Sequence, residues 1–347
     1  MLATAPPRHD ASTGSLRLGP RGLALLRANA SLDDVGSLAL VTGHIRAFGD
    51  AQFQPLVQAS WARLGFEAST PVALHTWDAA GSEPSWWQLH TEHAAMHVQA
   101  PLVSVERALR NSSLAAQFLV YAVEDQRVAP VRTAHALLAA RSCANERELD
   151  GMYSMYTSLA AQAYALRRVV ALAEEFGRLA PGRISPSTLV LKTRPDVILE
   201  PRQHGVSFVR SVEAKLRASG GRDPLQIWTC KGWHKLGVSD VAFVTTYEGL
   251  TLLANAYQCC LPRLLESGRL ACGLAPMPEV VLRVFVDALG FRVHNGAFNL
   301  RWCRRPEACF EASEPANDEM ADRLPAFHAA VDAARECVRT ARADCTL

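Results

Sequence analysis

The chain has 347 residues, of which 49% are hydrophobic and 20% are charged. This composition excludes a disordered chain and supplies enough apolar side chains for a large buried core. The formal net charge is only +2, from 36 basic and 34 acidic residues, and no basic stripe with interleaved aromatic residues is present, so nothing indicates a nucleic-acid partner.

Residues 1–34 precede the first predicted strand. Their prolines and small residues form no hydrophobic block of the kind that a secretion signal carries. No apolar run in the chain approaches the roughly 20 residues that a membrane-spanning helix needs. We therefore expect a flexible leader, no transmembrane segment and, by default, a cytoplasmic location.

Short apolar runs and helical patterns alternate after the leader. Residues 37–42 and 71–76 predict buried strands, and residues 51–64 between them predict a helix. A further strand is predicted at 117–123. Strand, helix and strand joined by short connections are typical of a parallel sheet that is covered on both faces.

The clearest helical pattern covers residues 151–176 and ends before Gly177. Residues 188–192 predict another buried strand, which should end near Pro195 because proline cannot donate to a sheet ladder. No repeat or low-complexity linker interrupts the chain, so we expect one domain over 35–315 and a C-terminal helix within 316–347. The remaining predicted elements are strands at 206–209, 241–244 and 291–293 and helices at 250–265, 278–289 and 318–343.

The nine cysteines include no CxxC pair and therefore indicate neither a zinc ribbon nor a small disulfide scaffold. We expect them to be mostly buried free thiols.

Polar residues follow two of the predicted strands. Thr42, Gly43 and Arg46 follow the first: the glycine would let backbone amides approach a phosphate, and Arg46 can pair with a diphosphate through two hydrogen bonds. Trp77 and Asp78 follow the second, where they suit stacking on a base and accepting a ribose hydroxyl. The alternatives are an ordinary turn and a buried tryptophan beside a turn aspartate.

Lys192, Arg194 and Asp196 lie at the end of the 188–192 strand. A carboxylate flanked by two basic residues at a buried strand end is poorly explained by packing. Such a group can neutralise a diphosphate, either directly or through a divalent cation held on Asp196. The alternative is a surface ion pair.

Taken in order, these segments resemble a diffuse group of GT-A-type glycosyltransferases that includes WavE-like lipopolysaccharide enzymes and relatives in large DNA viruses and algae. The resemblance covers residues 37–295 and depends on the succession of segments, because no single motif is specific. The matching segments are Val41–Arg46, Leu74–Asp78, Gln162, Leu191–Asp196, Ser239–Phe243, Pro278–Leu282 and Gly290–Val293.

The resemblance implies a GT-A-like, Rossmann-type αβα sandwich with a mostly parallel central sheet. It implies transfer of a sugar from a nucleotide-sugar donor to a hydroxyl of a glycan or lipid-linked acceptor. Gln162 would join the donor-binding residues. Asp240 and Glu279 become the candidate catalytic carboxylates, because an acceptor hydroxyl must lose its proton to a base. The alternative for Glu279 is a first-turn acid that only stabilises its helix.

Members of this group usually hold Mn²⁺ or Mg²⁺ on two carboxylates separated by one residue. Position 194 is arginine here, so Asp196 remains as the metal candidate, and Lys192 and Arg194 can share the work of the cation. We expect the loops bearing Arg46, Asp78 and Asp196 to converge at one edge of the sheet.

Two other functions remain open. The missing second carboxylate favours a non-catalytic carbohydrate- or protein-binding module on a degenerate transferase fold. A zinc enzyme is the weaker alternative, built on His90, His93 and His97 at helical spacing.

Overall fold

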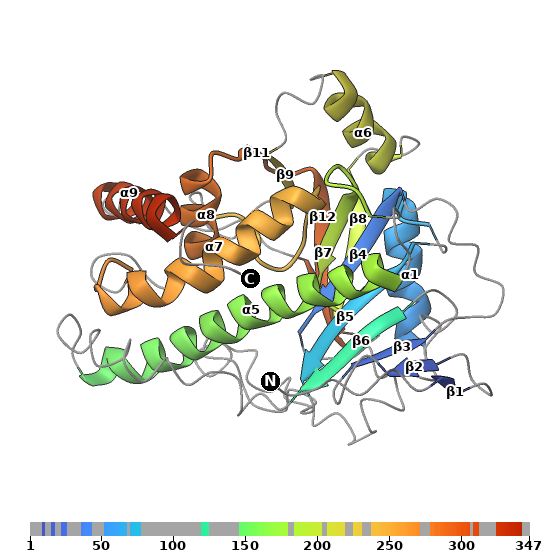
Figure 1. Cartoon of the computed structure of the whole chain (residues 1–347), viewed down its shortest axis with the longest axis horizontal. Helices are drawn as coiled ribbons and strands as arrows, with labels where there is room; N and C mark the ends of the chain where they lie inside the picture. The colour runs from blue at the N-terminus through green and yellow to red at the C-terminus, as the bar shows by residue number, and fades with distance from the viewer. Residues whose placement is uncertain are drawn as a thin grey trace.

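The computed structural model describes the core of the chain (Figure 1). The described residues form separate ranges, and at some element ends and in the N-terminal strands the description covers the backbone alone. The described ranges are 9–10, 15–17, 22–25, 36–43, 52–67, 70–77, 119–124, 146–179, 184–202, 207–218, 225–230, 237–270, 278–305, 308–311 and 324–341.

A mostly parallel sheet forms the centre of the molecule and confirms the predicted fold class. Within its central part, only β10 runs against the other strands: it pairs antiparallel with both of its neighbours. The central strands in spatial order are β6 (Leu119–Glu124), β5 (Val72–Trp77), β4 (Ser37–Thr42), β7 (Leu189–Thr193), β10 (Phe243–Thr246), β9 (Gln226–Thr229) and β11 (Arg292–His294).

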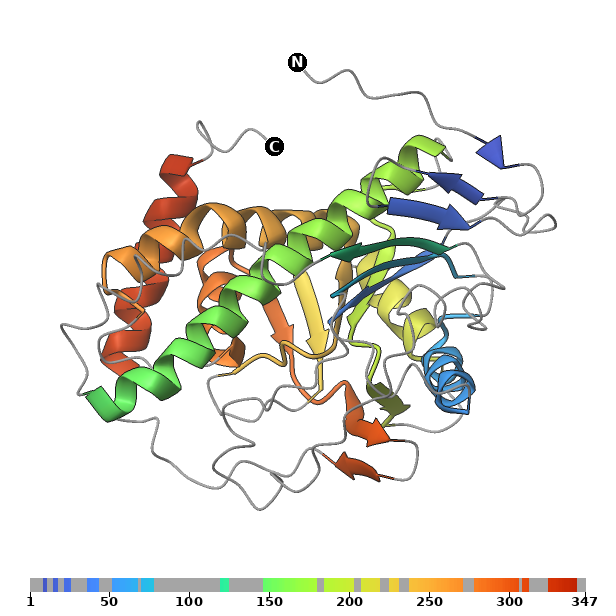
Figure 2. The ribbon, with the colours of Figure 1, turned by 90° about the horizontal axis from the view of Figure 1, so that it is seen from below.

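Helices cover both faces of this sheet and make it the middle of three layers (Figure 2). Along β4, Leu38 and Leu40 pack in the core shared with α5 (Glu146–Leu179), whereas Ala39 and Val41 pack in the core shared with α1 (Phe53–Leu64). This alternation follows from the two-residue period of a strand. A continuous apolar run such as residues 37–42 is therefore what a strand buried on both faces requires.

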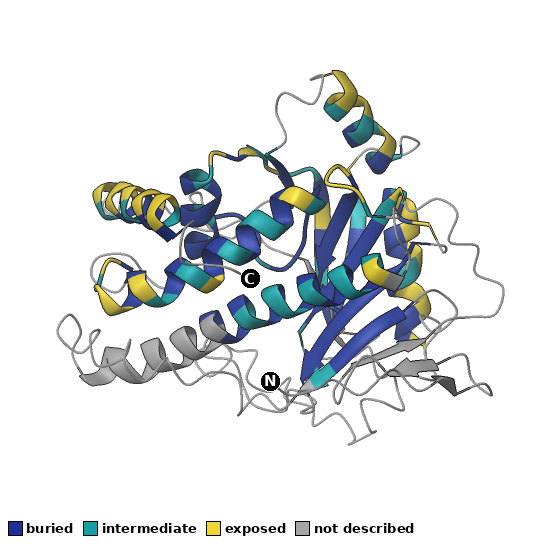
Figure 3. Cartoon of the chain, in the orientation of Figure 1, coloured by how far each residue is buried: buried dark blue, intermediate teal, exposed yellow. Residues whose placement is uncertain are grey.

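Three further helices extend the α5 layer: α7 (Tyr247–Glu266), α8 (Pro278–Ala288) and α9 (Leu324–Ala341). Their inward stripes are buried, and the outer face of α9 is exposed (Figure 3). α9 lies inside the range 316–347 that was predicted to hold a C-terminal helix. It packs its buried residues into the main core. Within the described ranges, no helix combines the length and apolarity required to cross a membrane.

A second, smaller sheet lies beside the α1 layer. It consists of β13 (Ala308–Glu311), β12 (Phe298–Arg305) and β8 (Val197–Pro201), paired antiparallel. The strand predicted at 206–209 is wrong, because this segment begins helix α6 (Phe208–Ala218). Val209 and Val212 are its buried residues, at helical spacing, and a four-residue window is too short to distinguish the two periods.

Three short strands lie within the range predicted as a leader. They are β1 (His9–Asp10), β2 (Ser15–Arg17) and β3 (Gly22–Leu25), and β3 pairs antiparallel with β6 at the edge of the main sheet.

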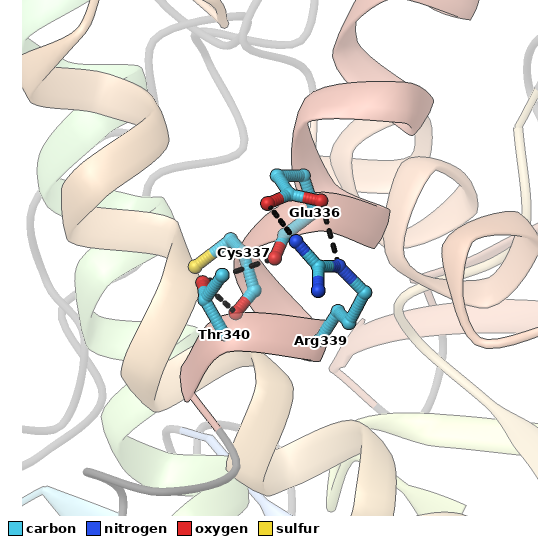
Figure 4. Close-up of polar contacts among 4 residues, drawn as sticks. All are labelled: Glu336, Cys337, Arg339 and Thr340. Atoms are coloured by element: carbon cyan, nitrogen blue, oxygen red, sulfur yellow. Dashed lines mark hydrogen bonds and ion pairs between the residues drawn. The ribbon is translucent and has the colours of Figure 1, made fainter.

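The expectation of free thiols is wrong for most cysteines whose side chains the structure describes. Cys260 of α7 and Cys337 of α9 form a disulfide with a Cα–Cα distance of 5.9 Å. Cys259 and Cys303 are also disulfide-bonded, whereas the described free cysteine is Cys230. Cys337 lies on α9 next to exposed polar contacts, which include an ion pair between Glu336 and Arg339 (Figure 4).

Candidate functional site

The chain order of the strands reverses between β4 and β7. β5 and β6 follow β4 on one side, whereas β7 lies on the other side, so the boundary between β4 and β7 is the switch point of the sheet. Ligands of open α/β sheets bind in the crevice that such a switch point creates. Gly43 leaves β4 and Arg194 leaves β7, and a Cβ at Gly43 would lie 3.7 Å from Cγ of Arg194.

Five charged residues meet at this edge, and we call them the switch-point cluster. Because β10 runs antiparallel to β7, its start lies beside the end of β7, with Phe243 opposite Lys192. The start of α8 is held to the segment before β10 by a hydrogen bond of 3.1 Å from Val238 N to the carbonyl oxygen of Glu279. The cluster consists of Lys192, Arg194, Asp196, Asp240 and Glu279.

Arg194 and Asp196 form an ion pair with two hydrogen bonds. Nε of Arg194 lies 2.9 Å from Oδ1 of Asp196, and an Nη atom lies 2.7 Å from Oδ2. The side chain of Arg194 is 23% exposed, whereas that of Asp196 is 2% exposed. Burial by itself lowers the pKa of Arg194, but the charge and hydrogen bond of Asp196 outweigh it and raise that pKa above its ordinary value.

Lys192 carries a buried amine and lies near the carboxyl end of β7. Its Nζ donates to the backbone carbonyl oxygen of Asp240 and lies 5.8 Å from the ring centroid of Phe243. Burial lowers the pKa of Lys192 to about 8, although the charge of Asp240 opposes this shift. At neutral pH the site therefore holds two positively charged side chains.

Asp240 and Glu279 form a carboxyl pair. Burial and the negative charge of Asp240 raise the pKa of Glu279 to about 8, and a hydrogen bond between the two side chains acts in the same direction. A hydrogen bond from the backbone N–H of Glu279 and the charge of Arg194 lower this pKa, and both are outweighed. A helix dipole alone would lower the pKa of Glu279, so the raised value reflects burial and Asp240, and the catalytic role of Glu279 stays a prediction.

Three residues near the cluster were not predicted. Tyr257 of α7 is buried close enough for the charges of Asp240 and Glu279 to add to the effect of burial, which raises its pKa well above the ordinary value. Cys230, at the end of β9, is buried, and burial raises its pKa to about 11. The ring of Trp302 lies 5.9 Å from the guanidinium carbon of Arg194.

The alternating apolar residues of β12 were a sequence signal for a strand that would carry Trp302 to the site. Tyr257 follows the general helical pattern of α7 and has no distinguishing signal. Cys230 has none either.

Thr42 and Gly43, which were predicted to bind donor, lie at the carboxyl end of β4, and their surroundings differ. Thr42 is buried and pairs with His75 in the ladder. The backbone N–H of Gly43 donates to the carbonyl oxygen of His75 at 3.2 Å, and the approach of a phosphate to this turn stays a prediction. The φ of +119° at Gly43 is one that side-chain-bearing residues rarely adopt.

Trp77 and Gln162, which were predicted to bind donor, lie on β5 and α5 and do not belong to the switch-point cluster. Trp77 is buried at the end of β5, and its ring stacks on Tyr164 of α5 with centroids 5.9 Å apart. A face that would stack on a base is therefore covered by the protein. Gln162 is a partly exposed residue of α5.

Arg46 and Asp78 lie outside the described residues, as do His90, His93 and His97. The strands that lead to Arg46 and Asp78 end side by side, with Thr42 opposite His75.

Asp196, which was predicted to hold a divalent cation, is paired with Arg194 in this structure, and its role as a metal ligand stays a prediction. Both of its carboxylate oxygens accept hydrogen bonds from Arg194, and the side chain lies behind that guanidinium. In the part of the chain that the structure describes, no three or more His, Cys, Asp or Glu side chains come together as a metal site.

The structure has a mixed α/β fold with a mostly parallel central sheet and a charged cluster at the switch point of that sheet. Among solved structures, the chain matches the apo crystal structure of mouse xyloside xylosyltransferase 1 at 12% identity. The match covers 74% of this chain and 84% of that chain, with a TM-score of 0.33. No model of a known protein family and no curated protein matches the chain, so the narrower WavE-like group stays a prediction.

Proposed function

We propose that the protein is a glycosyltransferase that moves a sugar from a nucleoside-diphosphate sugar to a hydroxyl group of a glycan or lipid-linked acceptor. The observation that carries this proposal is the switch-point cluster. Two cations and a carboxyl pair lie together where open α/β sheets bind their ligands. A diphosphate needs the cations, and an acceptor hydroxyl needs a carboxylate.

In the proposed reaction the cations of the cluster act on the departing diphosphate, and its carboxyl pair acts on the acceptor hydroxyl. The bond between the anomeric carbon and the phosphate oxygen breaks, and its electron pair stays on the departing diphosphate, where Arg194 and Lys192 balance the charge. The acceptor oxygen forms the new bond to the anomeric carbon. Its proton goes to the carboxyl pair, in which the negative charge of Asp240 lies beside Glu279, whose pKa is raised to about 8.

Burial makes this arrangement effective. Lys192 is 8% exposed and Asp196 is 2% exposed, so the charges act in a region of low effective dielectric. The side chain of Arg194 is 23% exposed, and it lies beside Gly43 at the end of β4. We therefore assign the first contact with the diphosphate to Arg194.

The test is a screen of the common nucleoside-diphosphate sugars for release of nucleoside diphosphate, with water or simple glycosides as acceptors. We expect slow release from one donor and faster release with a suitable acceptor. Binding of a donor without any release would favour a non-catalytic module on this fold. No binding of any donor would contradict the proposal.

A further inference from the structure

We propose that Arg194, held in place by Asp196, occupies the position of a divalent cation, so that this protein binds its nucleoside diphosphate without a metal ion. The inference rests on the proposed function and adds to it the means of charge neutralisation. It comes from the contacts and exposure of the Arg194–Asp196 pair.

The two partners of this pair are unequally exposed. The carboxylate of Asp196 is 2% exposed and lies behind a guanidinium whose side chain is 23% exposed. An approaching ligand therefore meets the positive partner first. A metal ion would meet a positive group where it needs a negative one.

Arg194 also has hydrogen-bonding capacity for a phosphate after pairing. Nε and one Nη atom donate to Asp196, and the other N–H bonds of the guanidinium point elsewhere. A planar guanidinium matches the geometry of phosphate oxygens better than a point charge does. Asp196 thereby orients the group that binds the anion, and it acts as a positioning residue.

The surroundings of Arg194 fix its side chain before any ligand arrives. The ring of Trp302 lies 5.9 Å from the guanidinium carbon, and the backbone of Gly43 lies alongside the aliphatic stem. A Cβ at Gly43 would lie 3.7 Å from Cγ of Arg194. A preorganised donor loses little conformational entropy when the phosphate binds.

A divalent cation at Asp196 would have two costs. It would displace both hydrogen bonds from Arg194, and it would then lie close to Arg194 and Lys192, whose positive charges repel it. In the described structure Lys192 is tied to the carbonyl oxygen of Asp240, within the same cluster.

The experiment is calorimetric titration of the full chain with UDP, GDP and ADP, once in EDTA and once in Mn²⁺. We expect at least one diphosphate to bind with the same Kd in both buffers. We expect Arg194→Lys, which keeps the charge but loses the planar fork, to weaken binding about 10- to 100-fold in EDTA.

Arg167→Lys is the matched control. Arg167 is also a largely buried arginine, and it is paired with the carboxylate of Glu174 at 3.2 Å. Both residues lie on α5 near Tyr247, which follows the end of β10 opposite to the cluster. The Arg167→Lys variant should bind the nucleoside diphosphate with the same Kd as the unaltered protein. If Arg194→Lys does not fold, the double variant Arg194→Met with Asp196→Asn removes both buried charges and should lose binding in the same way.

Two results would overturn the inference, and they differ in what they say about the proposed function. Binding that requires Mn²⁺ and disappears in Asp196→Asn would make Asp196 a metal ligand and leave the transferase proposal intact. Absence of binding in both buffers would overturn the inference and the proposed function together. Electron paramagnetic resonance of added Mn²⁺ gives an independent readout, in which we expect no Mn²⁺ bound at Asp196.

Discussion

Glu279, in the first turn of α8, shares a hydrogen bond with Asp240, which lies just before β10. A helix start favours an ionised carboxylate, yet burial and the charge of Asp240 outweigh it, and the pKa of Glu279 rises to about 8. Near neutral pH the Glu279 carboxyl group is therefore mostly protonated, and the negative charge that raises its pKa is that of Asp240. This charge lies next to Lys192, in the same cluster as the proposed diphosphate contact.

The carboxyl pair should matter for turnover more than for donor binding. We expect Asp240→Asn and Glu279→Gln each to lower the rate of sugar transfer by about 10²- to 10⁴-fold, the usual contribution of a general base. The Kd for the nucleoside diphosphate should change little, because neither change removes a cation. Transfer kinetics and calorimetry on the same preparations measure both effects. Equal losses in binding and turnover would place the pair on the donor side.

The pKa of Glu279 also makes stability depend on pH. This pKa rises from 4.5 to about 8 on folding, so between these values the folded state binds more protons than the unfolded state. Its contribution to the free energy of unfolding therefore falls as pH rises from about 5 to about 8. Glu279→Gln should remove that part of the slope, as measured by urea unfolding at a series of pH values. Parallel curves for the two proteins would show that Glu279 titrates normally.

Lys192 should produce the opposite slope in the next pH range. Its pKa falls from 10.5 to about 8 on folding, so between these values the folded state binds fewer protons than the unfolded state. The contribution of Lys192 to stability therefore increases as pH rises above 8. Lys192→Met should remove this increase in the same unfolding series, and an unchanged increase would contradict the assigned burial effect.

Gly43 should be needed for its backbone conformation. An alanine at φ +119° is strained, and the strain should cost about 1–3 kcal/mol, although its Cβ would make only an ordinary contact with Arg194. Gly43→Ala should also weaken diphosphate binding, because relaxation of this strain moves the stem of Arg194. Gly290→Ala is the control: its φ is +77°, and a Cβ there meets nothing within 4 Å. It should lower stability and leave binding unchanged.

The disulfide between Cys260 and Cys337 should contribute strongly to stability. It closes a loop with a sequence separation of 77, for which the chain-entropy model gives about 4 kcal/mol. Replacing both cysteines by alanine should lower Tm, and the control Glu336→Gln, beside Cys337 on the exposed face, should not (Figure 4). Because such bonds persist in oxidising compartments, we expect the protein to fold in one, instead of in the cytoplasm. A Tm that is insensitive to reductant would contradict the stabilising role of the disulfide.

Much of the fold could be predicted from the sequence because continuous apolar runs mark strands that are buried on both faces. The runs at 37–42 and 188–192 became β4 and β7 with bounds shifted by at most one residue. α6 was misread because its apolar stripe is narrow. Strands β8, β12 and β13 were missed because half-covered strands in a small sheet carry a weaker pattern.

The charged part of the site was also predictable. Lys192, Arg194 and Asp196 lie at the end of one strand, β7, so their proximity follows from the sequence. Asp240 joins them because β10 runs antiparallel to β7 and begins where β7 ends. The ion pairing and the pKa of each group were not predictable, because they depend on burial and on the partners that the fold brings together. The pairing of Asp196 with Arg194 and the raised pKa of Glu279 are both of this kind.

The most direct test of the central claim is a crystal structure of the full chain with the nucleoside diphosphate that binds it most tightly. We expect the diphosphate at the carboxyl ends of β4 and β7, with its oxygens on the guanidinium of Arg194 and near Nζ of Lys192. A diphosphate bound elsewhere on the molecule, with the Arg194–Asp196 pair untouched, would contradict the account.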